Sequence, residues 1–265
     1  MDPQSGKPQP IVIGPTEPIV IGSTQPISIG PGPPPIMVHP PPVISIRIPR
    51  QPIHLMHEAG VDPAFVTAAN HGIDRVLRAA AVPLATIDFG LWRLPNWRTT
   101  AGELVRYRSI DHYLSEARIT IGPRVDQINP GIFHGFCEHE PWQKQVPHYD
   151  VAILTSQLSG QRSPTHGSAV PYWSALISLF HFSELSVQDG QLVIEAITAH
   201  EVGHLFGLWP GTTGEARYAF HCPEPSCVMQ QLWQPVDWIA KGKALQMGRS
   251  PFCTGCLTYL HRYFD

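Results

Sequence analysis

The sequence predicts an α+β fold for residues 53–265, preceded by an extension of different composition. The 265-residue chain contains 29 prolines, and 15 of these lie in residues 1–52, together with only five charged residues. Proline at this frequency removes backbone donors and blocks helices. The remaining part, about 210 residues long, has the composition of a globular domain and a size that suits one domain with two lobes around a cleft.

Local patterns in residues 53–265 give both helix and strand signals. A helix is predicted for residues 62–81, because an aspartate suited to the N-cap is followed by a proline in the first turn. Strands are predicted for residues 150–155 and 173–182, which are apolar, branched or aromatic runs bounded by turn residues. A short C-terminal helix is predicted for residues 257–264.

Residues 1–52 include an eight-residue repeat at 9–16, 17–24 and 25–32, which keeps Pro, Ile, Ile and Gly in fixed places. We expect an extended or polyproline-like arm, although its isoleucines are unusual for a disordered tail. Two interpretations stay open. The arm binds a protein partner by adding a strand to a sheet edge, or it is a variable low-complexity extension.

His200, Glu201 and His204 form the motif HEVGH on a predicted helix. Residues four apart share a helix face, so both histidines can bind one tetrahedral zinc ion. Glu201 would then lie beside the metal and take a proton from its bound water. Gly207 suits the C-terminal cap of this helix. The pattern is typical of zinc peptidases.

A catalytic zinc needs a third ligand, and the next histidine is His221, at the start of HCPEPSCVM, which a CTGC motif follows. HExxHxxG, then HC, four residues, CxM and a later CxxC together resemble the archaemetzincins, two-zinc members of the metzincin clan of metalloproteases. The resemblance spans roughly residues 60–265. It implies a metzincin-like zincin fold, with a mixed β-sheet and the active-site helix in an upper subdomain (53–207). A small zinc-stabilised lower subdomain (208–265) would follow.

The resemblance also implies two zinc ions: a catalytic ion on His200, His204 and His221 beside the general base Glu201, and a structural ion. The structural ligands would be Cys222, Cys227, Cys253 and Cys256. Two close cysteine pairs independently fit a closed four-thiolate site. Two disulfides are the alternative, which a reducing compartment disfavours. Met229 matches the Met-turn methionine, a packing residue beneath the catalytic zinc.

The spacing before His221 departs from the family pattern. HExxHxxGxxH would place the third ligand at position 210, which is proline. We interpret residues 210–220 as an inserted surface loop, whose closure costs little extra entropy with added length. Glu215 within the loop is an alternative third ligand, and a site without a working third ligand is another alternative.

Cys137 has no partner in these motifs, and His134, Glu138 and His139 lie near it in the sequence. A further metal site is one interpretation, as is a thiolate that blocks the catalytic zinc. The simpler interpretation is an inert, buried small hydrophobe.

Charge and hydropathy narrow the function classes. A net charge of −3 implies no strong attraction to nucleic acids or anionic membranes. No apolar run approaches the roughly 20 residues that span a bilayer, and no export signal is recognised, so a cytoplasmic location is expected. The predicted function is a zinc-dependent peptidase acting on peptides or proteins, with residues 166–172 at the rim of its cleft. The alternative is a catalytically impaired, zinc-stabilised binding or scaffold protein that uses the N-terminal arm.

Overall fold

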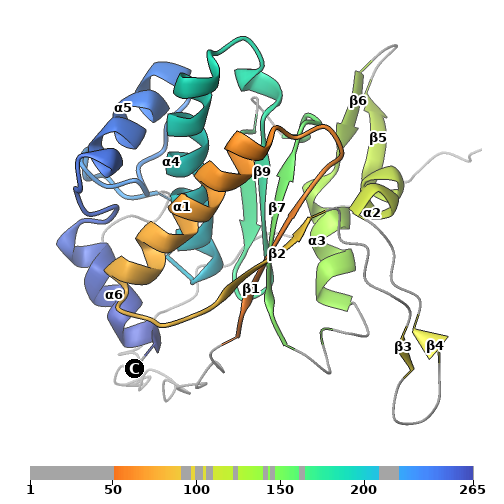
Figure 1. Cartoon of the computed structure of the whole chain (residues 1–265), viewed down its shortest axis with the longest axis horizontal. Helices are drawn as coiled ribbons and strands as arrows, with labels where there is room; N and C mark the ends of the chain where they lie inside the picture. Colours follow the sequence, from red (N-terminus) through yellow and green to blue (C-terminus); the bar gives the residue numbers. More distant parts are fainter. Residues whose placement is uncertain are drawn as a thin grey trace, which may run out of the picture. The chain divides into compact units, whose positions relative to one another are not determined.

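The computed structural model describes residues 51–90, 97–98, 104–105, 110–121, 125–139, 143, 147–160, 165–208 and 221–264. The N-terminal repeats and residues 210–220, with Glu215, lie outside the described residues. A five-stranded sheet is built from β1 (Ile53–His57), β2 (Thr86–Gly90), β7 (Tyr149–Leu154), β8 (Gly167–Val170) and β9 (Ser174–Ser178). The strand order is β2-β1-β7-β9-β8, with β8 as an antiparallel edge strand and the other neighbours parallel (Figure 1). The predicted α+β class and mixed sheet are therefore confirmed.

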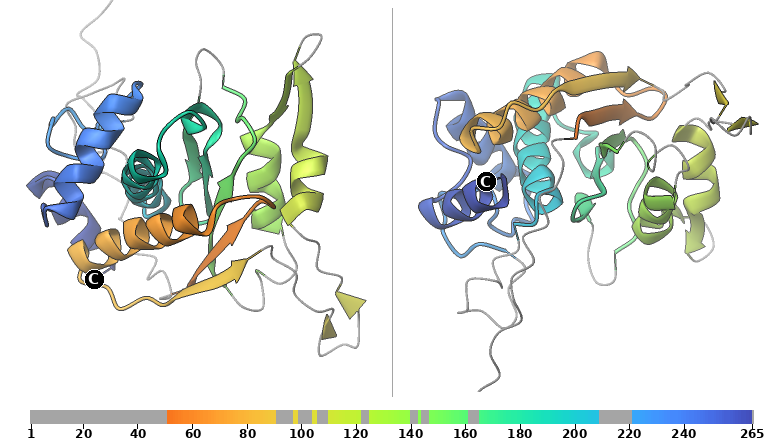
Figure 2. Two further views of the ribbon diagram at one scale, coloured as in Figure 1. Left: turned by 45° about the horizontal axis from the view of Figure 1, so that its top comes forward. Right: turned by 90° about the horizontal axis from the view of Figure 1, so that it is seen from below.

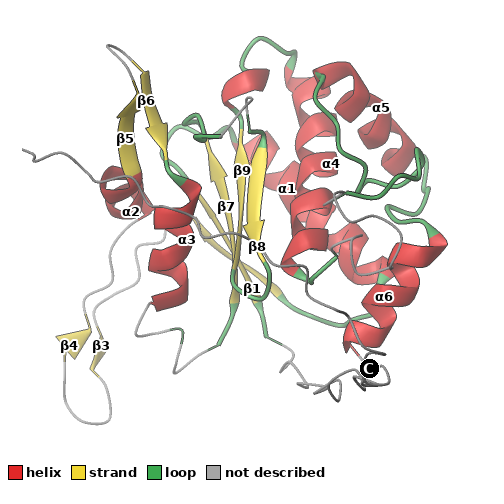
Figure 3. Cartoon of the chain, turned by 180° about the vertical axis from the view of Figure 1, so that it is seen from behind, coloured by secondary structure: helices red, strands yellow, loops and turns green. Residues whose placement is uncertain are grey.

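Helices cover both faces of this sheet. On one face lie α1 (Pro63–Ala79) and α4 (Val187–Leu205), and on the other lie α2 (Ile110–Ala117) and α3 (Pro130–His139), as opposite views show (Figures 1 and 3). Two further helices, α5 (Pro235–Gln246) and α6 (Thr254–Phe264), follow α4 and lie on its side of the sheet (Figure 2). Two small hairpins complete the described elements: β3 (Trp97–Arg98) with β4 (Leu104–Val105), and β5 (Arg118–Ile121) with β6 (Val125–Ile128).

Alternation along the strands divides the interior into two cores. Ile53 and Leu55 of β1 pack in the core that contains α1 and α4, whereas Met56 packs with α2 and α3. Successive side chains of a strand point to opposite faces, so each strand supplies both cores. A side chain's position along a strand therefore decides which helices it meets.

Helix α4 lies between α1 and α5, and two glycines allow this close approach. A Cβ at Gly72 of α1 would overlap the carbonyl oxygen of Glu195, and a Cβ at Gly242 of α5 would overlap that of Leu192. Every residue of α4 from Leu192 onward is buried. Its one buried acid in the first half, Glu195, is paired with Arg75 at 3.0 Å. The tight packing fixes the position of the helix that carries HEVGH.

The local signals for helix ends are confirmed. The Asp62 carboxylate accepts a hydrogen bond from the Ala64 amide at 2.8 Å and caps α1. Helix α4 starts after Ser186, whose hydroxyl accepts from the Asp189 amide at 3.1 Å. It ends before Gly207, whose φ of +77° is the left-handed conformation that a C-terminal cap requires.

Two predicted boundaries are wrong. The strand expected over residues 173–182 ends at Ser178, and Phe180–Phe182 form a short 3-10 helix. The Phe182 amide bonds to Leu179 O at 2.9 Å, which replaces sheet pairing with a tight turn. The C-terminal helix begins at Thr254, three residues earlier than expected, so it includes Cys256.

Candidate metal centres

The last turns of α4 place His200 and His204 side by side. Each ring donates its Nδ1 hydrogen to a backbone carbonyl, His200 to Val228 O at 2.6 Å and His204 to Leu208 O at 2.9 Å. These bonds fix the tautomer, so both Nε2 atoms present lone pairs to each other at 3.0 Å. Two lone pairs repel unless a cation lies between them, and tetrahedral zinc with bonds of about 2.0 Å holds its nitrogens about 3.3 Å apart. The pair therefore fits zinc.

His221 completes the group. Its ring centroid lies 5.2 Å from that of His200 and 5.3 Å from that of His204, and one ligand atom of each histidine lies within 4.8 Å of the other two. Burial lowers the pKa of all three, that of His204 to about 4. Neutral imidazoles are the form that binds a metal. The thirteen residues between Gly207 and His221 thus do not separate His221 from the other two histidines.

Glu201 follows His200 on the same helix and lies against the edge strand. A Cβ at Gly167 in β8 would overlap its carboxylate, so the two are in direct contact. Glu201 is 6 % exposed, and burial raises the pKa of its carboxyl to about 8. A bound cation nearby would lower that pKa again, since opposite charge favours the ionised form.

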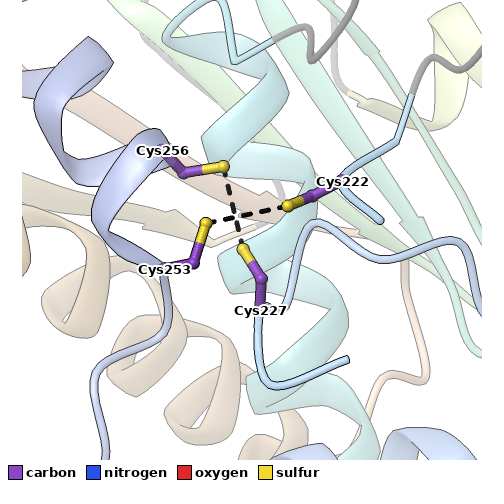
Figure 4. A group of neighbouring side chains, drawn as sticks. All are labelled: Cys222, Cys227, Cys253 and Cys256. Carbon is purple, nitrogen blue, oxygen red and sulfur yellow. Dashed lines mark hydrogen bonds between the residues drawn. The ribbon is translucent and has the colours of Figure 1, made fainter. Parts of the chain in front are cut away.

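The four motif cysteines meet at a second point, where their sulfur atoms converge (Figure 4). Sγ of Cys222 lies 3.7 Å from Sγ of Cys253, and Sγ of Cys227 lies 3.8 Å from Sγ of Cys256. All four cysteines are free thiols, and both distances match the edge of about 3.8 Å expected for tetrahedral zinc with Zn–S bonds of about 2.3 Å. The structure therefore favours the metal interpretation over two disulfides.

The closeness of these thiols moves their pKa values apart. The hydrogen bond between Cys227 and Cys256 lowers the pKa of Cys227 to about 6, whereas burial raises that of Cys222 to about 11. Without a cation the thiols share protons, because crowded thiolates repel one another. The Lys241 ammonium, which donates to the carbonyl oxygens of Pro225 and Cys227, adds a positive charge nearby.

One short backbone segment joins the two centres. Cys227 belongs to the cysteine group, the next residue offers its carbonyl to His200, and Met229 follows. The Met229 sulfur packs against Gly203 of α4, and its carbonyl accepts from the Cys222 amide at 2.8 Å. The methionine is fully buried against the histidine-bearing helix, an environment that both a Met-turn and an ordinary core methionine would have. The two orienting carbonyls had no sequence signal, because any residue supplies one.

The residues around Cys137 do not form the further site considered from the sequence. His134 bonds Ser174 Oγ at 2.6 Å and Ser168 Oγ at 3.1 Å, and His139 bonds Gly135 O at the surface. Cys137 itself is buried, and burial raises its pKa well above the ordinary value. It lies on the α3 side of the sheet, away from the HEVGH helix.

Comparisons with known proteins show the fold. The sequence matches no protein-family model and no curated protein. The structure is similar to that of archaemetzincin from Methanopyrus kandleri, with a TM-score of 0.51 and 16 % identity over 80 % of this chain and 94 % of that chain. A zinc-dependent peptidase from Methanocorpusculum labreanum has a TM-score of 0.45 and 18 % identity, over 78 % of this chain and 99 % of its own. The first similarity establishes that this chain shares the fold of that archaemetzincin.

Proposed function

We propose that the chain is a zinc-dependent peptidase. His200, His204 and His221 would bind the catalytic zinc, and the four cysteines would bind a structural one. The observation that carries the proposal is Glu201, a buried acid that follows His200 on α4, next in the chain to a group of three converging histidines, and touches an edge strand. A purely structural zinc site has no use for such a carboxylate.

The mechanism assigns one role to each group. When bound, zinc supplies Lewis-acid polarisation of the scissile carbonyl and lowers the pKa of its water to about 7. Glu201 accepts a proton from the attacking water and then delivers it to the departing amine nitrogen. The carbonyls of Val228 and Leu208 hold the imidazole rings in orientation through Nδ1.

In this proposal, the edge strand β8 binds an extended peptide substrate. It pairs with β9 on one side only among the described strands, and its first residue, Gly167, touches the proposed base. The Tyr172 amide donates to Leu205 O at 2.8 Å, which ties the β8–β9 turn to the end of α4. An extended peptide that adds to β8 through main-chain hydrogen bonds would thus pass Glu201. This placement agrees with the rim expected for residues 166–172.

Gly167→Ala tests the contact between β8 and the base. The added methyl would displace the buried Glu201 carboxylate, and a misplacement of about 1 Å can lower kcat/KM by about 100-fold. We expect a fall of about 10- to 100-fold in peptide hydrolysis with both zinc ions retained. Ser168→Ala is the matched control on the same strand and should hydrolyse peptides like the wild type. Equal activity of both variants would contradict the placement of Glu201.

His221→Gln tests the third ligand. We expect the affinity of the catalytic zinc to fall by at least about 100-fold, measured by chelator competition, because two histidines alone bind zinc weakly. The four-cysteine site should keep its metal, and the exposed His139→Gln is the control. Unchanged affinity in His221→Gln combined with a loss in Glu215→Gln would assign the ligand to the inserted segment instead.

The alternative function, a zinc-stabilised binding or scaffold protein, is favoured by Pro210 at the family's ligand position. Two zinc ions per chain without cleavage of any member of a peptide library would support it. The arm's protein partner, the domain boundaries (1–52, 53–207 and 208–265) and the cytoplasmic location stay predictions. Within the described residues, no helix is long and apolar enough to cross a membrane.

A further inference from the structure

Three other side chains with metal-binding atoms meet where two parallel strands begin. His54 of β1 is the register partner of Asp150 in β7, and His148 lies two residues before Asp150. One ligand atom of each lies within 4.8 Å of the other two. All three side chains are at most 1 % exposed. The arrangement brings together residues about a hundred positions apart in the sequence.

This group is separate from the two zinc centres. His54 alternates with Ile53 and Leu55, which face α1 and α4, so His54 faces the opposite side of the sheet. Asp150 likewise alternates with Tyr149 and Val151, which belong to the same α4-side core. The group therefore lies on the α3 side, with the full thickness of the sheet between it and the HEVGH helix.

The Asp150 carboxylate carries a negative charge into this core. His148 Nε2 approaches its Oδ1 at 3.3 Å, and the neutral Cys137 thiol lies within hydrogen-bonding reach of the same carboxylate. An isolated buried carboxylate costs several kcal/mol unless a partner compensates its charge. The thiol of Cys137 adjoins the same carboxylate, whose charge raises the pKa of that thiol, so it supplies no compensating positive charge.

The two imidazoles lie face to face, and the support for a common ion is the closeness of their ligand atoms to Asp150. Their rings stack with centroids 4.0 Å apart and planes 19° from parallel. Both rings cannot be protonated at this distance without strong repulsion. Gln143 holds His148 in place from both sides, donating from Nε2 to His148 O at 2.6 Å and accepting from its amide at 3.2 Å. The buried Gln143 amide thus holds the backbone of His148 at the start of β7.

We propose that His54, His148 and Asp150 bind a third metal ion, a divalent cation of the zinc type. Two imidazoles and a carboxylate are a ligand set that zinc accepts, and the positive charge compensates Asp150. The site is closed to solvent, so its role is structural: the ion ties the start of β1 to β7. The proposal is independent of peptidase activity.

The rival interpretation is a metal-free ion pair between a protonated His148 and Asp150. The test measures the zinc content of the full chain. The protein is purified from zinc-supplemented cells and dialysed against a buffer that binds zinc only weakly. To remove the catalytic ion from the count, we would use His200→Gln/His204→Gln as the parent. The proposal expects two zinc ions per chain in this parent and one after Asp150→Asn is added.

His134→Gln in the same parent is the matched control, because His134 is also buried on the α3 side but lies outside the group. It should keep two ions. One ion in the parent chain, with the thiolate charge-transfer bands of the cysteine site present after cobalt substitution, would overturn the proposal without any further variant, so the test holds even if Asp150→Asn does not fold. Cobalt substitution gives a second readout, since the third site should add d–d absorption without the thiolate charge-transfer bands of the cysteine site. Two ions in both the parent and Asp150→Asn would also overturn the assignment.

Discussion

Glu201→Gln lowers peptide hydrolysis by a factor of about 10² to 10⁴ and leaves the zinc content unchanged, if Glu201 is the general base. Glutamine has nearly the same shape, so the contact with Gly167 and the packing of α4 are kept. It cannot accept a proton from water. Because the proposed ligands are three histidines and do not include Glu201, the metal should stay bound. The measurement is kcat/KM on a cleavable peptide together with zinc content.

Glu195→Gln provides the matched control for this experiment. Glu195 is a second buried glutamate on α4, 2 % exposed, but its carboxylate is paired with Arg75 and lies away from the histidines. We expect this variant to lose stability, because a buried ion pair is broken, while its activity per folded molecule stays near that of the wild type. If Glu195→Gln and Glu201→Gln lost activity equally, the loss would reflect damage to α4 rather than removal of a base.

Local signals explain how much of this protein could be predicted from its sequence. Asp62 and Gly207 act within one turn of their own helices, so their effects are readable without a fold. The HEVGH spacing is equally local. The cysteine pairs were recognised because metal ligands of a given type recur at short spacings. These features placed the two centres.

Long-range contacts explain what was missed. The end of β9 at Ser178 depends on a turn that competes with sheet pairing, and an apolar run cannot show where pairing stops. The approach of α5 to α4 depends on Gly242 meeting a backbone fifty residues away. His54 and Asp150 become neighbours only through the parallel register of β1 and β7. The one available hint was a histidine two residues before an aspartate at the start of a predicted strand.

If both groups bind zinc as proposed, the segment that joins them makes the cysteine site important for the histidine site. The carbonyl that orients His200 belongs to Val228, directly after Cys227, and Val228 is itself held by a hydrogen bond from its amide to Pro251 O at 2.8 Å. Pro251 lies two residues before Cys253. A metal that fixes both cysteines therefore fixes both ends of this link, and its loss should be felt at the histidines.

Cys227→Ser should accordingly remove the structural zinc and weaken the catalytic one. In zinc-finger peptides such sites contribute about 10 to 16 kcal/mol of apparent binding energy that is also folding energy, which matches or exceeds the stability of a typical domain. We expect the region from the cysteine loop through α6 to lose its cooperative unfolding transition. Freed from its carbonyl partner, the His200 ring should bind zinc about 10- to 100-fold more weakly.

Cys137→Ser is the matched control for this change, because Cys137 is equally buried but lies on the α3 side, away from the four sulfurs. In cobalt-substituted protein, the thiolate charge-transfer bands should vanish in Cys227→Ser and keep their full intensity in Cys137→Ser. Hydrogen exchange should show faster exchange of the α6 amides in Cys227→Ser alone. Loss of the charge-transfer bands with unchanged catalytic zinc affinity would show that the two centres are mechanically independent, since the Val228 carbonyl would then hold His200 without help from the structural metal.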